Sequence, residues 1–87
     1  MSKSDKLIKR LLSRPSDFTF KELETLLLSL GFKLLTTGST SGSAVRFVNK
    51  ITKQVIRLHK PHPQPELKLY LIKFVISELR KGGYLGD

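Results

Sequence analysis

The sequence predicts an α+β fold with the element order α-α-β-β-β-α, in which a three-stranded antiparallel sheet has its helices packed on one face. Apolar residues recur at helical spacing in the first and last thirds of the chain, whereas the middle third alternates with the two-residue period of half-buried strands. Only short connections separate the strands, which favours an antiparallel meander. Because the chain has 87 residues, a single domain over residues 1–87 is expected.

Two helices are expected before the first strand. In residues 4–14 four aliphatic side chains form one stripe, and Pro15 ends the helix. A short basic amphipathic helix can bind a membrane surface, but two turns with four aliphatic residues are more typical of docking on a core. The second helix is expected over residues 20–30, because Thr19 and Glu22 form a capping-box pattern and Gly31 fits the left-handed position after a helix.

Strands are expected over residues 32–37, 44–49 and 54–59, and a last helix is expected over residues 66–81. Three prolines between residues 61 and 65 exclude a helix in the approach to it. The apolar face of the last helix should pack on the sheet. Tyr70 and Phe74 lie at the edge of that face, where an extension of the core is the favoured interpretation and a partner surface is the alternative.

The composition indicates an anionic partner. Sixteen basic residues stand against seven acidic ones, and the resulting net charge of +9 attracts nucleic acid, an acidic protein or an anionic membrane. No apolar run approaches the roughly 20 residues that cross a bilayer, and the first residues lack the apolar core of a signal peptide. With no cysteine in the chain, we expect a cytoplasmic protein without disulfides and without a membrane partner.

Alternation along the strands sorts their side chains onto two faces. The residues that can face the helices are Phe32, Leu34, Val45, Phe47, Ile56 and Leu58. The residues left for the opposite face are Lys33, Ala44, Arg46, Val55, Arg57 and His59. Cations on an open sheet face predict a platform for a phosphate backbone. The predicted RNA-binding residues are Lys33, Arg46, Arg57 and Lys60. The alternative is that lysine and arginine are simply what exposed strand positions tolerate.

Both histidines of the chain, His59 and His62, lie at the end of the last strand. Histidine titrates near neutral pH and therefore serves as a general acid or base. RNA carries its own nucleophile, the 2′-hydroxyl, so a base, an acid and nearby cations suffice for cleavage without a metal or cofactor. His59 and His62 are the candidate catalytic residues, on a spacing that is a weak signal alone. Two imidazoles without a cysteine or an acidic cluster leave a tetrahedral metal site incomplete.

Four segments of the chain resemble the HicA-type toxins of bacterial and archaeal toxin–antitoxin systems. They are L-L-L-S-L-G-F, T-G-S-T-S-G-S-A-V-R-F, V-I-R-L-H-K-P-H-P and P-E-L-K. The resemblance implies a fold similar to a double-stranded-RNA-binding domain. It also implies a type II toxin that acts as an mRNA interferase, a metal-independent endoribonuclease, and a HicB-like antitoxin, often acidic, that binds the toxin and blocks its site.

The resemblance breaks down at one residue. In the family an active histidine usually follows the glycine-serine pair, whereas here Gly42 and Ser43 are followed by Ala44. His62 matches a histidine that is often seen before the E-L-K segment, which is not the usual catalytic position. Two interpretations therefore compete: a ribonuclease in which His59 or His62 replaces the lost group, and an RNA-binding module with little or no cleavage activity. A third is an interaction module whose basic face binds only an acidic HicB-like antitoxin.

Overall fold

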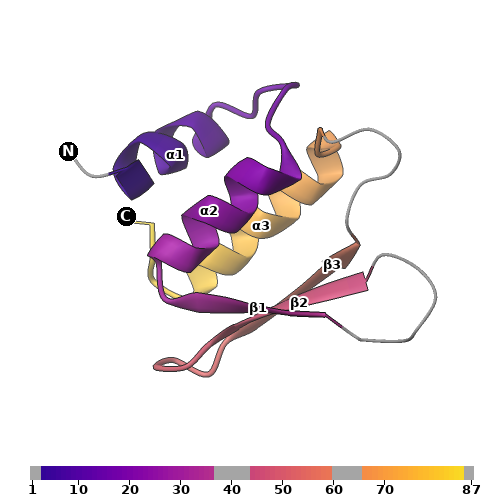
Figure 1. Cartoon of the computed structure of the whole chain (residues 1–87). Helices are drawn as coiled ribbons and strands as arrows, with labels where there is room; N and C mark the ends of the chain where they lie inside the picture. Colours follow the sequence, from indigo (N-terminus) through magenta and orange to yellow (C-terminus); the bar gives the residue numbers. More distant parts are fainter. Residues whose placement is uncertain (1–2, 37–43, 60–65, 86–87) are drawn as a thin grey trace.

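The computed structural model describes residues 3–36, 44–59 and 66–85, which form three layers (Figure 1). The elements are α1 (Lys3–Leu12), α2 (Phe20–Ser29), β1 (Phe32–Thr36), β2 (Ala44–Asn49), β3 (Val55–His59) and α3 (Leu69–Lys81). The strands form one antiparallel sheet in the order β1-β2-β3. Helices α2 and α3 lie across one face of this sheet, and α1 packs outside them. The predicted α+β fold and its element order are confirmed, and the arrangement fits the predicted likeness to a double-stranded-RNA-binding domain.

The first helix ends earlier than the sequence predicted. It stops at Leu12, and Arg14 adopts a left-handed conformation with a φ of 53°. Proline disfavours the helical region for the residue before it, so Pro15 excludes Arg14 from the helix. None of the described helices is both long and apolar enough to span a bilayer.

The last helix begins three residues later than predicted, at Leu69 instead of Glu66. Glu66 forms an isolated antiparallel bridge with Thr19. The amide of Leu67 then donates to the carbonyl of Phe18 at 2.8 Å. These contacts hold the residues before α3 extended, because their backbone groups are already paired with the segment that leads into α2.

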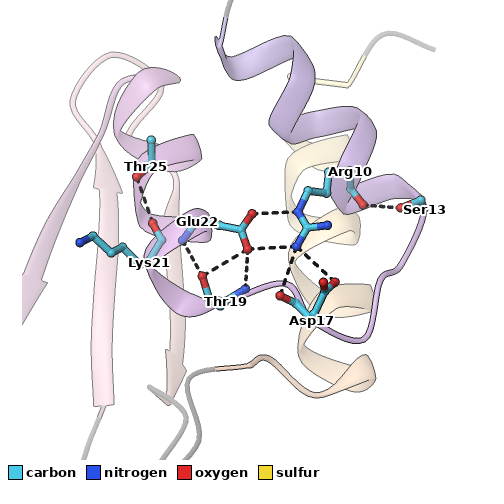
Figure 2. Close-up of polar contacts among 7 residues, drawn as sticks. All are labelled: Arg10, Ser13, Asp17, Thr19, Lys21, Glu22 and Thr25. Carbon is cyan, nitrogen blue, oxygen red and sulfur yellow. Dashed lines mark hydrogen bonds and ion pairs between the residues drawn. The ribbon is translucent and has the colours of Figure 1, made fainter.

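A polar cluster fastens α1 to the start of α2 (Figure 2). Thr19 Oγ1 accepts from the Glu22 amide at 3.2 Å and Glu22 Oε1 accepts from the Thr19 amide at 3.0 Å, which confirms the predicted capping box. Arg10 Nε donates to Glu22 Oε2 at 2.8 Å, and its Nη2 reaches Asp17 Oδ1 at 3.2 Å. The hydrogen bond from Arg10 lowers the pKa of Glu22 and in turn raises the pKa of Arg10. This cluster therefore stabilises the ionised carboxylate.

One hydrophobic core joins the helices to the inner face of the sheet. Its sheet residues are Phe32, Val45, Phe47, Ile56 and Leu58, with Leu34 half-buried beside them, as the alternation predicted. Tyr70 and Phe74 are instead 65% and 38% exposed. The favoured interpretation that they extend the core is wrong, because other residues of α3 fill the space over the sheet. Those residues are Leu71, Ile72, Val75, Ile76 and Leu79.

Candidate nucleic-acid interface

One face of the sheet points away from α2 and α3 and is here called the outer face. It carries most of the residues that were predicted from the sequence to bind RNA. Lys33, Arg57 and His59 are exposed on it, and Arg46 is half-buried near its centre. None of the described helices lies over this face (Figure 1). The predicted separation of apolar and basic side chains onto opposite faces is therefore confirmed for these four residues.

The turn between β2 and β3 sets which residues lie opposite each other. Asn49 is 2% exposed, and its Oδ1 accepts from the amides of Ile51 and Thr52 at 2.9 and 3.0 Å. Its Nδ2 donates to the carbonyl of Leu30 at 3.2 Å, and its amide donates to the carbonyl of Gln54 at 2.9 Å. Because the side chain of Asn49 holds the turn and its backbone amide pairs with Gln54, the length of the turn and the register of β3 are held together.

This register arranges the outer face in three rows across the strands. The rows are Lys33, Val48 and Val55; then Leu35, Arg46 and Arg57; then Ala44 and His59. Hydrogen-bonded and non-hydrogen-bonded pairs alternate along an antiparallel ladder. Since Asn49 and Gln54 form a hydrogen-bonded pair, the pairs Arg46–Arg57 and Ala44–His59 are of the non-hydrogen-bonded kind. In such pairs the Cα atoms lie about 4.5 Å apart and the side chains approach most closely.

The two arginines have no acidic partner within the part of the chain that the structure describes. No strand contains aspartate or glutamate, and the ion pairs present there join Arg10 and Lys81 to carboxylates of the helical side. Arg46 Nε is also buried without a hydrogen-bond partner among the described residues. A depression of about 440 Å³ lies beside these groups. Its lining residues are Ala44, Val45, Arg46, Arg57, Leu58 and His59.

The outer face also carries apolar residues that the sequence interpretation left out. Leu35 is 37% exposed and lies beside Arg46, and Val48 lies between Lys33 and Val55. The same two-residue alternation that selected the cations would have placed both on this face. The interface is therefore amphipathic, with apolar side chains both in the row of the arginine pair and in the row that contains Lys33.

Some predicted site residues cannot be placed. Lys60 and His62 lie outside the described residues, as do Gly42 and Ser43. Their assigned roles remain predictions, and the same holds for the absence of a metal requirement. Within residues 3–36, 44–59 and 66–85, no three histidine, cysteine, aspartate or glutamate side chains gather as a metal ion would require.

Residues 20–82 match a family model described as the HicA toxin of bacterial toxin–antitoxin. The match runs from the first residue of α2 to the residue after α3, so it includes the whole sheet and leaves α1 outside. No curated protein and no solved structure matches the chain.

Proposed function

The chain belongs to the HicA family of bacterial toxin–antitoxin toxins, and on this premise we propose that its outer face binds mRNA and that His59 takes part in cleaving it. One feature carries this proposal: an arginine pair that has no carboxylate partner among the described residues lies next to a histidine around one depression. The activity would be metal-independent, would belong to a type II system and would act in the cytoplasm, where mRNA is translated.

Binding follows from charge and exposure. Lys33, Arg46 and Arg57 point to the same side of the sheet, and no strand residue neutralises them. Arginine and lysine that contact phosphates release condensed counterions, so the affinity falls as salt rises. For three contacts to a single strand we expect a slope of about −2 for the logarithm of the binding constant against the logarithm of the salt concentration.

Cleavage would use the 2′-hydroxyl of the RNA. Its oxygen attacks the adjacent phosphorus while a base removes its proton, and the 5′-oxygen leaves with a proton from an acid, giving a 2′,3′-cyclic phosphate and a 5′-hydroxyl. His59 supports this role because it lies directly across from Ala44, the position where the family resemblance implies a histidine. His59 also lines the same depression, from the neighbouring strand. His62, as predicted from the sequence, would supply the second proton-transfer group.

The test is cleavage of a structureless, 5′-labelled RNA in EDTA by wild type, His59→Ala and His62→Ala. His59→Gln is the matched control, since it keeps a polar side chain of similar size but transfers no proton at neutral pH. We expect wild type to cut, and both His59 variants to lose about 10²-fold or more in rate. Equal rates in wild type and His59→Gln would exclude His59 as a proton-transfer group. If the RNA stayed intact in all reactions but its binding to the protein fell steeply with salt, the protein would be an RNA-binding module without cleavage activity.

A second candidate function is binding of the antitoxin that family membership implies. It is favoured by an exposed apolar stripe on α3, where Leu69, Tyr70 and Phe74 are 51%, 65% and 38% exposed. Lys73 is exposed next to them, so an acidic protein segment with apolar anchors would complement the stripe. Tyr70→Ser should weaken the complex with the co-expressed antitoxin and leave RNA binding unchanged, as measured by calorimetry and fluorescence anisotropy. Unchanged antitoxin affinity would exclude this surface.

A further inference from the structure

We propose that Arg46 and Arg57 form a clamp for a single phosphate group, in which the shape of the guanidinium groups, and not their charge alone, determines the affinity. The clamp rests on the proposed RNA-binding function and specifies where one phosphodiester of the RNA is held. Its ligand class is the tetrahedral phosphate oxyanion, whether in an RNA backbone or as free inorganic phosphate.

The first support is the position of the pair on the sheet. Arg46 and Arg57 are direct cross-strand partners, and the hydrogen bond from Asn49 to Gln54 makes theirs a non-hydrogen-bonded pair. Their Cα atoms are therefore about 4.5 Å apart, with both side chains on the outer face. Like charges directly opposite each other destabilise a sheet. An anion between the guanidinium groups would remove that repulsion.

The second support is that the pair has free hydrogen-bond donors as far as the described residues go. Among the described residues neither arginine has a carboxylate partner, and Arg46 Nε is both buried and without a hydrogen-bond acceptor. A buried donor left unpaired costs free energy, so the site is incomplete without an acceptor. Phosphate oxygens are suitable acceptors because the planar fork of arginine donors matches their geometry bidentately.

The third support is the space beside the pair. The depression that Arg46 and Arg57 line extends over Ala44 and His59 in the neighbouring row. Ala44 contributes only a methyl group, so a phosphate held by the arginines can lie over it without meeting a larger side chain. The clamped phosphodiester would then lie next to His59. Lys33 lies in a different row, two residues along β1 from the partner of Arg46, and acts as a separate point charge.

The test compares variants that keep the charge but change its shape: Arg46→Lys and Arg57→Lys. Lys21→Gln, at an exposed residue of α2, is the control that removes a charge outside the outer face. Inorganic phosphate is titrated at low ionic strength while the arginine Nε–Hε signals are followed by NMR. We expect the Arg46 Hε signal to move on saturation, and each lysine variant to bind phosphate about tenfold more weakly. Lys21→Gln should bind phosphate within about twofold of wild type, because salt screens charges that lie more than a Debye length apart.

The same variants are then tested with a labelled single-stranded RNA, which separates the clamp from the proposed function. Phosphate affinity within twofold of wild type in both lysine variants would overturn the clamp, as would phosphate-induced shifts confined to Arg10 or another distant arginine. If RNA binding by those variants were also normal, the RNA-binding face would stand without a clamp. If wild type bound no RNA at low salt, the proposed function would fail, while the phosphate titration would still decide the clamp. Thermal unfolding of each variant confirms that the fold is kept.

Discussion

Replacing Ala44 with histidine is the most direct test of the site. Ala44 and His59 form a non-hydrogen-bonded pair, so their Cβ atoms are about 5 Å apart on the outer face. An imidazole at residue 44 would point into the depression that already contains His59 and the two arginines. Two proton-transfer groups would then flank the position proposed for the phosphate.

The expected gain can be estimated from the chemistry that the new group would provide. A well-positioned general acid or base contributes 10²–10⁴-fold to the rate. The residues around position 44 pack against a methyl group and do not orient an imidazole. We therefore expect a gain at the lower end of this range, about 10²-fold faster RNA cleavage. Ala44 is half-buried on a strand, where alanine is a poor strand former. The free energy of unfolding should therefore change by less than about 1 kcal/mol.

The assay is single-turnover cleavage of labelled RNA in EDTA, with the protein in excess. Ala44→Gln is the matched control, because it adds a polar side chain of similar length that transfers no proton at neutral pH. Combining Ala44→His with His59→Ala shows whether the two imidazoles act together, since residues that act as a unit give non-additive losses. A folded Ala44→His protein that binds RNA normally and cuts no faster than Ala44→Gln would refute the placement of the reaction beside His59.

Three further predictions concern stability and are measured by urea unfolding. Glu22→Gln should lower the free energy of unfolding by about 1 kcal/mol at pH 7, because Glu22 both caps α2 and pairs with Arg10. Since the folded-state pKa of Glu22 is lowered from 4.5, this contribution is present above that value and lost as the pH falls through the lowered pKa, so wild type and variant should converge in acid. Asn49→Ala should cost about 2–4 kcal/mol, because it leaves two amides of the turn and the carbonyl of Leu30 without their buried partner. Arg57→Thr should stabilise the protein by about 1 kcal/mol at low salt by relieving repulsion with Arg46, and the gain should disappear in 1 M salt; an equal gain at both salt concentrations would contradict an electrostatic cause.

The elements of the fold could be predicted because their signals are local. The capping box at Thr19, the glycine after α2 and the alternation along β2 each depend on residues a few positions apart. The start of α3, in contrast, was predicted wrongly because it depends on a distant contact. Glu66 is extended because it pairs with Thr19, and nothing in residues 66–68 alone indicates that bridge.

The site was only partly predictable for a related reason. Alternation places Arg46, Arg57 and His59 on one face, but it does not say which residues are opposite each other. That pairing depends on the turn between β2 and β3, whose length follows from the buried contacts of Asn49. The pairing of Ala44 with His59, which motivates the proposed cleavage, therefore became visible only with the register of the strands.

The distribution of charge explains how so small a fold can carry a binding site that is unfavourable when empty. Every carboxylate in the described residues lies outside the strands, and Glu22 and Glu78 pair with cations there. The outer face keeps its positive charge, including the pair Arg46 and Arg57. Two unit charges about 7 Å apart repel by about 0.6 kcal/mol in bulk water and about 2 kcal/mol at the effective dielectric of a protein surface. That repulsion is small compared with the free energy of unfolding of a typical domain, which is roughly 5–15 kcal/mol. The core can therefore hold the two arginines together until a phosphate neutralises them.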